Sequence, residues 1–453
     1  MTGDAQAAPR NKDWFGHPRG LTFLFGTEMW ERFSYYGMRA LLVLYMVDHL
    51  LQPGNAEQVL GLATLRQALE SISGPLAVQP FASQIYGLYS GLVYLTPILG
   101  GWLADRWLGR RRTVAMGAGL MVAGHFLMAS ERFFLLALVL LILGSGAFKP
   151  NIVTQVGALY GARDARRDRA YSIFYVGINI GAFFSPLVCG TLGETVGWHY
   201  GFGSAGVGMA VGLGIYLAGA KSLPAHEAPP EVAGPPQEET SLRRALLGLA
   251  LLFLPSALFW AAYEQQGNTI ALFAQGADRS IGLGARSVDI PVTWFQAFNP
   301  LMIFAFTPLV VGLWARMARR GREPSTLAKL WTGCFGLAAG YLVLALGAVM
   351  TEGTQASWLW LLAYFVVITF AELYFSPIGL SLVSRMAPRS SRSLVMGLWM
   401  ASTFTGNLSA GWLGSLWSRL PHGVFFLIVA GVSAAAGLLL VLARRKLGAL
   451  LPA

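Results

Sequence analysis

This chain of 453 residues is 55% hydrophobic and only 12% charged, whereas ordinary soluble domains have roughly 25% charged residues. Its mean hydropathy of +0.54 excludes an ordinary soluble protein and favours one that crosses a membrane many times. We interpret the net charge of +11 as membrane orientation rather than nucleic-acid binding. Cys189 and Cys334 both lie in apolar segments, which indicates neither a disulfide framework nor a metal site.

The N-terminal residues 1–20 are polar and show no cleavable signal peptide, so we expect a tail. Residues 50–79 form a longer connection, in which Leu60, Leu65, Leu69 and Ile72 favour a short amphipathic surface helix. A membrane-crossing helix needs about 20 mostly apolar residues. Twelve apolar spans of about that length follow one another, near residues 21–47, 80–104, 112–130, 133–159, 171–193, 202–220, 244–274, 291–315, 327–350, 357–386, 394–418 and 423–443.

The distribution of Lys and Arg predicts the orientation of these spans. If the N-terminus is cytoplasmic, twenty-five of them fall in cytoplasmic segments and five in outer segments. Positive residues prefer the cytoplasmic side, so both termini are predicted to be cytoplasmic.

A linker rich in Pro and Glu divides the spans into two sets of six, which is typical of pseudo-symmetric transporters. The fold class predicted is therefore an all-α integral membrane protein of two six-helix bundles. The expected parts are a cytoplasmic tail 1–20, an N-terminal bundle 21–220, a cytoplasmic linker 221–243, a C-terminal bundle 244–443 and a cytoplasmic tail 444–453.

Charged residues inside the spans carry most of the functional information. Each charge at the centre of a membrane helix costs about 2.5–3.5 kcal/mol on insertion scales, so we expect these residues to face one interior and to pair across helices. Static structural bridges are the alternative, but apolar packing would hold a bundle without that cost. The four acids are Glu28, Glu31, Glu264 and Glu372, and the three cations are Arg32, Arg39 and Lys149.

This count leaves one acid without a cation, and a buried carboxylate without a partner tends to hold a proton. In the first span the helical period places Glu28, Glu31, Arg32 and Arg39 on one side of the helix, together with Tyr35 and Tyr36. A site that takes up and releases a proton, with acids in both halves, is what proton-coupled alternating access requires.

A second set of polar residues lies in the same spans, and it contains Asn179, Asn299, Tyr35, Tyr36 and Tyr94. Amides and phenols beside buried charges can hold both ends of a zwitterion. For a single Asn, an ordinary hydrogen bond between helices remains the alternative.

Several motifs resemble a known family. Gly101-x-x-x-Asp105-Arg106-x-x-x-Arg110-Arg111 resembles the loop signature of the major facilitator superfamily. The ExxER motif at 28–32 resembles that of the proton-dependent oligopeptide transporters (POT family). Further matching segments are Phe148-Lys149-Pro150-Asn151, Phe174-Tyr175-x-x-Ile178-Asn179, Phe259-Trp260-x-x-x-Glu264-Gln265, Gln296-x-x-Asn299-Pro300, Glu372-Leu373-x-x-Ser376-Pro377 and Met396-Gly397-x-Trp399.

The resemblance implies a role for each matching residue. The peptide carboxylate would meet Arg32, Tyr36 and Lys149, and the peptide amine would meet Asn179, Asn299 and Glu372. Tyr94 would contact substrate, and Trp260 and Trp399 would line side-chain pockets. Arg39 with Glu264 would close the outer side, and Lys149 with Glu372 the inner side. Glu28, Glu31, Arg32 and Glu264 would couple transport to the proton.

The chain departs from the family in two places. The linker is too short for the two extra helices of many bacterial members, and Tyr86 is followed by Gly87, where animal members have a histidine. His125 lies outside every motif and is interpreted as packing. The seventh and eighth spans contain no histidine, which argues against a nitrate carrier of the plant pattern.

We therefore predict a multi-pass protein of the inner (plasma) membrane that imports di- and tripeptides with protons. It is expected to act as a monomer in the lipid bilayer, with no cofactor besides the proton, no metal and no nucleic acid. One alternative keeps the fold but carries an amino acid, a modified peptide, an organic anion or nitrate. Another is a membrane receptor or enzyme, but no cluster of nucleophile, base or metal ligands supports an enzyme.

Overall fold

The computed structural model describes residues 13–14, 16–161, 164, 166–223, 241–283, 286–388 and 391–450. Most of the predicted linker, the first twelve residues and residues 451–453 lie outside this part of the chain. Arg163 and Arg389, which entered the charge count, also lie outside the described residues.

Helices cover all twelve predicted spans in the described part of the chain. In the first half they are α1 (Arg19–Tyr45), α3 (Val78–Leu95) with α4 (Pro97–Leu103), α5 (Arg110–Leu127), α6 (Phe134–Ala158), α7 (Arg166–Ser185) with α8 (Thr191–Thr195), and α9 (Trp198–Gly219). In the second half they are α10 (Leu242–Tyr263) with α11 (Thr269–Gln275), α12 (Phe298–Arg319), α13 (Thr326–Met350), α14 (Leu359–Met386), α15 (Arg392–Gly414) and α16 (His422–Leu450).

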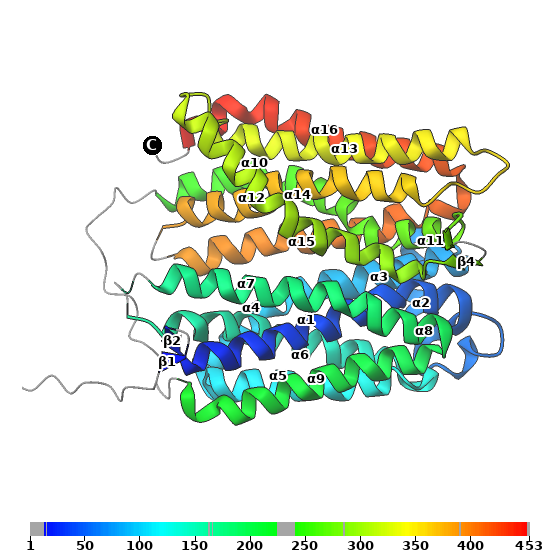
Figure 1. The fold of residues 1–453 in the computed structure, drawn as a ribbon, viewed down its shortest axis with the longest axis horizontal. Helices are drawn as coiled ribbons and strands as arrows, with labels where there is room; N and C mark the ends of the chain where they lie inside the picture. The colour runs from blue at the N-terminus through cyan, green and yellow to red at the C-terminus, as the bar shows by residue number, and fades with distance from the viewer. Residues whose placement is uncertain are drawn as a thin grey trace, which may run out of the picture.

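Within the described residues, eight helical segments are long and apolar enough to cross a membrane. The helices at the other four predicted spans are α1, α3, α5 and α15. They fall short because they carry charged or polar side chains, such as Glu28, Glu31 and Arg32 in α1 and three successive arginines at the start of α5. Figure 1 shows all of these helices side by side along the long axis of the molecule.

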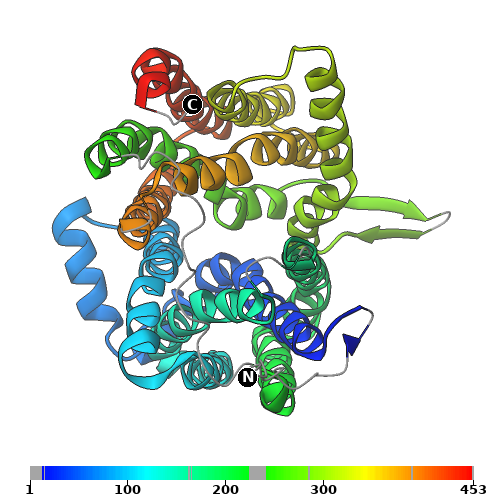
Figure 2. The same ribbon diagram turned by 90° about the vertical axis from the view of Figure 1, so that its left-hand side faces the viewer.

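The buried hydrophobic residues form two separate clusters. One contains residues from Leu21 to Leu223, and the other contains residues from Ala245 to Leu447 together with Leu44. Figure 2 views the molecule along its helices, with the first half below and the second half above. The limits of the predicted domains stay predictions, and α16 continues to Leu450, beyond the limit of 443 expected for the last bundle.

Short elements complete the fold. The predicted surface helix after the first span is confirmed as α2 (Leu62–Ser73). Its Leu65 and Leu69 pack against the first cluster, but Leu60 and Ile72 are exposed. The sequence analysis did not predict the antiparallel pair of β3 (Ser280–Leu283) and β4 (Arg286–Asp289), which projects from the bundle in Figure 2. A second short pair joins β1 (Asp13–Trp14) and β2 (His17–Pro18) at the start of α1.

Two of the predicted charged residues, Glu264 and Lys149, lie where the regular hydrogen bonding of a helix changes. The α-helical hydrogen bonding of α10 ends at Tyr263, and Glu264 begins the 3₁₀ helix η7 (Glu264–Gly267) before α11 resumes the path. The prediction of one continuous span at 244–274 missed this change. Pro150 lies inside α6 directly after Lys149; proline has no N–H for the helix ladder.

Candidate functional site

The ExxER residues of α1 form a compact buried cluster. Arg32 Nε lies 2.8 Å from Glu28 Oε1 and 2.6 Å from Glu31 Oε2. Glu28 and Glu31 are 3% and 0% exposed. Apart from these contacts with Arg32, Glu28 Oε2 and both carboxylate oxygens of Glu31 have no hydrogen-bond partner among the described residues. Two acids therefore share one guanidinium, with carboxylate oxygens left over.

Lys149 of α6 supplies the second cation of this cluster. Its Nζ lies 4.3 Å from the ring centroid of Tyr35 and 5.5 Å from that of Tyr94, which are cation–π contacts. Lys149 also interacts electrostatically with Arg32, Glu28 and Glu31. The first half therefore holds two acids and two basic residues near one another.

The second half presents an acid without a cation. Asn299 Nδ2, at the start of α12, donates to Glu372 Oε2 of α14 at 2.8 Å and to Thr369 Oγ1 at 3.2 Å. In the described part of the chain no ion pair involves Glu372. Sequence counting predicted one unpaired acid, and the geometry identifies Glu372 as that acid.

Arg39 and Glu264 join the two halves nearer the side that the sequence predicts to face outward. Arg39 Nη2 donates to Glu264 Oε2 in a close ion pair. Arg39 Nε also donates to the hydroxyl of Tyr86 in α3 at 2.7 Å. The predicted pair is therefore brought together, and Tyr86 is a partner that the sequence analysis did not assign. Its signals in the sequence were its position in an apolar span and its place directly before Gly87, where the chain departs from the family pattern.

Glu194 of α8 was also missed, and it fixes the start of η8 (Val292–Ala297) in the second half. Its carboxylate accepts from the backbone N–H groups of Val292 and Thr293 at 2.8 and 2.9 Å, and from Thr293 Oγ1 at 2.6 Å. The first N–H groups of a helix lack internal partners, so an acid from the other half satisfies them and binds the halves together.

Further contacts near Arg39 and Glu194 also join the two halves. Ser83 Oγ donates to Asn268 Oδ1 at 2.7 Å, and Gln275 Nε2 donates to Asp48 Oδ2 at 2.7 Å. Gly87 and Gly411 allow α3 and α15 to touch, because a Cβ on Gly87 would lie 2.6 Å from the Cα of Gly411.

The contacts between the halves described above, from Arg39–Glu264 to Gln275–Asp48, lie at or beyond the level of Arg39. Lys149 and Glu372, the pair predicted for the inner side, are not bonded to each other here. This is the arrangement expected of a state closed to the outside, and the inner pairing stays a prediction.

The remaining predicted residues lie on α1, α7, α10 and α15. Tyr36 packs edge-on against Tyr35, with ring centroids 5.2 Å apart. Asn179 Nδ2 donates to the carbonyl of Tyr175 in its own helix at 3.0 Å. Trp260 packs edge-on against Tyr263 at 5.4 Å, and its buried Nε1 has no hydrogen-bond partner in the described region. Trp399 is 5% exposed.

Exposure separates these residues into two groups. Glu28, Glu31, Arg32, Arg39, Asn179 and Glu264 are buried, whereas the other polar residues proposed for peptide contact are only half-buried. This second group contains Tyr36, Tyr94, Lys149, Asn299 and Glu372. His125 is fully buried in α5, as expected for a packing residue.

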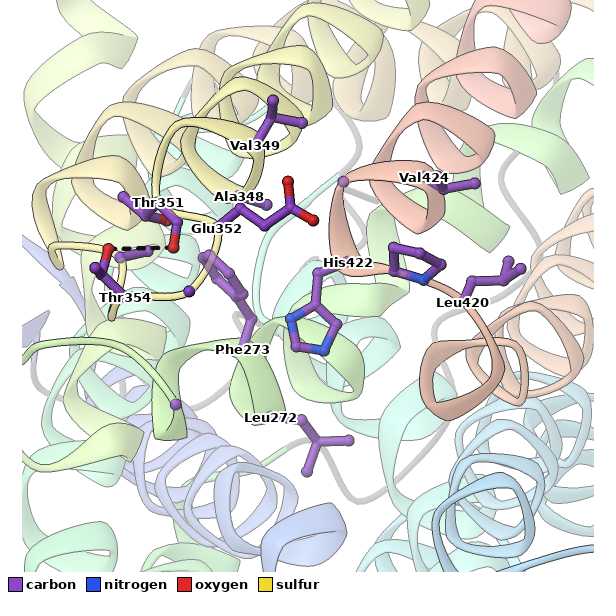
Figure 3. Close-up of a pocket in the computed structure, with 15 residues that line it drawn as sticks. Leu272, Phe273, Ala348, Val349, Thr351, Glu352, Thr354, Leu420, His422 and Val424 are labelled. Carbon is purple, nitrogen blue, oxygen red and sulfur yellow. Dashed lines mark hydrogen bonds between the residues drawn. The ribbon is translucent and has the colours of Figure 1, made fainter.

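A cavity of about 650 Å³ lies at the outer end of the second half, and Figure 3 shows the residues that line it. Phe273 of α11, Glu352 after α13 and His422 at the start of α16 line it. None of the residues predicted for substrate or proton lines this cavity, so we assign it no part in transport.

Comparisons with known proteins identify the family. A family model described as "POT family" matches residues 111–234 and 235–427. The chain belongs to the POT family. A curated di-/tripeptide transporter of Lactococcus lactis subsp. cremoris is 32% identical, with 96% of this chain and 97% of that protein covered. The peptide transporter YePEPT of Yersinia enterocolitica is 32% identical over 90% of this chain and 89% of its own.

Solved structures of POT family members agree with the fold. A crystal structure of a POT peptide transporter in complex with sulfate superposes with a TM-score of 0.84 at 29% identity, covering 98% of both chains. A POT family transporter in complex with 5-aminolevulinic acid gives 0.82 at 26% identity, covering 96% of this chain and 98% of that chain. The protein is therefore a multi-pass membrane protein of the major facilitator fold, and its named relatives are transporters rather than enzymes.

The Glu194 contact gives a test of the closed outer side. Glu194→Ala removes three hydrogen bonds to an ionised acceptor, and bonds of this kind contribute about 1.5–3 kcal/mol each. We expect the population open to the outside to rise at least tenfold, because a tenfold change requires only about 1.4 kcal/mol. Spin labels at exposed Ile72 and Thr354 would report this as a longer distance between the outer ends.

The matched control is Glu57→Ala. Glu57 is an exposed outer acid that accepts a bond from Gly54 N within its own loop, so its removal should leave the distance unchanged. The native cysteines, Cys189 and Cys334, are buried and should not take up label. An unchanged distance distribution in Glu194→Ala would show that this acid does not hold the halves together.

Proposed function

We propose that this protein is a proton-coupled symporter that imports di- and tripeptides across the inner (plasma) membrane by alternating access. Relatives that cover nearly the whole chain are named di-/tripeptide transporters. The proposal covers four properties that the fold alone does not determine. They are the peptide cargo, the coupling to protons, the monomeric state and the location in the inner membrane.

The proposal rests on one observation: basic side chains lie in the first half, and an acid without an ion-pair partner among the described residues lies in the second half. Lys149 and Arg32 lie with aromatic hydroxyls in the first half, whereas Glu372 lies with Asn299 in the second. A peptide has a carboxylate at one end and an ammonium at the other. Its carboxylate would bind Lys149, Arg32, Tyr36 and Tyr94, and its ammonium would give Glu372 the cation that it lacks, with Asn299 and Asn179 as further acceptors.

Aromatic residues near the proposed peptide site could hold peptide side chains without selecting one of them strictly. Trp260 and Trp399 belong to different helices of the second half, α10 and α15. Aromatic rings provide apolar contact area without demanding one shape. We propose that they line pockets for peptide side chains, which would allow many sequences to be carried.

The proton sites proposed are Glu28, Glu31, Arg32 and Glu264. Two carboxylates share the single guanidinium of Arg32, so protonation of either acid relieves the repulsion between them and frees Arg32 for a peptide carboxylate. Protonation of Glu264 would release Arg39 and allow the outer side to open. On the inner side, Lys149 and Glu372 would pair when peptide is absent.

The cargo can be tested by uptake of labelled dialanine into proteoliposomes that contain the purified protein. We expect saturable uptake that unlabelled di- and tripeptides inhibit and that free alanine and nitrate do not. Empty liposomes control for leakage. Uptake inhibited equally by alanine, or no uptake of dialanine, would reject peptides as the main cargo.

A second cargo deserves a direct comparison because of one structural relative. A POT family transporter with a TM-score of 0.82 to this chain was solved in complex with 5-aminolevulinic acid. That molecule also has an amine and a carboxylate, so the same opposite charges could hold it. Inhibition of dialanine uptake by 5-aminolevulinic acid would place it in this site, as a second substrate or an inhibitor.

A further inference from the structure

Three titratable side chains meet on the outer side of the first half, away from the transport residues. They are His49 in the π-helical turn η1 (Met46–Leu50), Glu131 in the 3₁₀ turn η4 (Glu131–Phe133) and His199 near the start of α9. Their nitrogen and carboxylate oxygen atoms all lie within 4.8 Å of one another. Three separate outer helix ends therefore contribute one potential ligand each.

The distances suit a small metal ion. His49 Nε2 lies 3.1 Å from Glu131 Oε1, and His199 Nε2 lies 3.2 Å from the same oxygen. Two ligands of a tetrahedral zinc site with bonds of about 2.0 Å are about 3.3 Å apart. The two measured separations are thus close to those of bound ligands, so little movement is needed to admit an ion.

The surroundings leave the cluster accessible and hold one ligand in place. The side chains of His49, Glu131 and His199 are 34%, 26% and 44% exposed, so solvent reaches all three. Tyr45 is fully buried beneath, and its ring centroid lies 5.6 Å from that of His49. A water molecule could fill the fourth position.

We propose that His49, Glu131 and His199 bind one divalent transition-metal ion of the zinc class at the outer face of the protein. Two imidazoles and one carboxylate are a ligand set that zinc uses when one position stays open. Nothing in this inference depends on the identity of the transported solute. The competing interpretation is a hydrogen-bonded group that holds three helix ends without metal.

Isothermal titration of the full-length purified protein with ZnCl₂, after removal of any histidine tag, tests the proposal. We expect one zinc per chain with a dissociation constant in the micromolar range or below. His49→Ala and His199→Ala should each weaken binding at least tenfold, and Glu131→Gln should weaken it while keeping a polar partner for both histidines. The matched control is His422→Gln, which changes an outer histidine that stacks on Trp417 at 3.9 Å outside the cluster.

X-ray absorption at the zinc edge provides a second measurement. It should show nitrogen and oxygen neighbours at about 2.0–2.1 Å, with the signature of imidazole. The absence of saturable zinc binding, or binding that is unchanged in Glu131→Gln and in the His49→Ala/His199→Ala double variant, would overturn the proposal. Dialanine uptake reports separately on the proposed function, so failure of one does not imply failure of the other.

Discussion

Glu372→Gln is expected to lower the affinity for dialanine about ten- to hundredfold. Among the described residues Glu372 makes no ion pair, and its hydrogen bond from Asn299 comes from a neutral amide. A charge-assisted bond to a peptide ammonium contributes about 1.5–3 kcal/mol, which corresponds to this loss. Binding can be measured by inhibition of counterflow, which requires no proton gradient.

The control for this prediction uses the ligand as well as the protein. N-acetyl-dialanine has no ammonium, so the native protein should bind it much more weakly than dialanine. Glu372→Gln should bind the two compounds with similar affinity. If the variant still distinguishes them as strongly as the native protein does, Glu372 does not receive the peptide amine.

Arg39→Ala and Arg32→Ala should have different effects although both arginines lie on α1. Arg39 contacts Glu264 and Tyr86, so its removal leaves a buried carboxylate without a cation. Breaking a buried pair in this way costs about 3–5 kcal/mol. We expect Arg39→Ala to lower proton-driven uptake at least tenfold. The affinity for peptide should change less than about threefold, which corresponds to about 0.6 kcal/mol of binding free energy.

Arg32→Ala should weaken both peptide binding and proton-driven uptake. Arg32 lies against Glu28 and Glu31 and is close to Lys149, so its loss removes a proposed carboxylate ligand and changes the proton site together. Arg132→Ala, which removes an exposed outer arginine, is the matched control and should affect neither measurement. Equal effects of Arg32→Ala and Arg39→Ala on binding would contradict the proposed division of α1.

The sequence predicted the helices well because the membrane imposes a simple rule on them. In the described part of the chain, helices lie at all the predicted apolar spans, including α1 with its charged residues. A hydropathy pattern does not reveal a change in backbone conformation when the sequence on both sides of it stays apolar. The change to a 3₁₀ turn at Glu264 and the β3–β4 pair were therefore missed.

The candidate site was predictable in part. Charge counting within the spans selected the seven charged residues of the candidate site, and the resemblance to the POT family paired Arg39 with Glu264, which are 225 residues apart. Tyr86 and Glu194 could not be found in this way. A tyrosine in an apolar span and a glutamate near a helix end are common, and only the fold brings them to Arg39 and to Thr293. His49, Glu131 and His199 likewise have no metal-binding spacing in the sequence.

The central claim is that peptide and proton cross together. The most direct measurement places the purified protein in liposomes that enclose a pH-sensitive dye, with a membrane potential negative inside, and adds dialanine outside. We predict acidification of the interior that depends on dialanine, saturates with its concentration and requires a higher dialanine concentration in Glu372→Gln. Uptake of labelled dialanine without any accompanying acidification would contradict proton coupling.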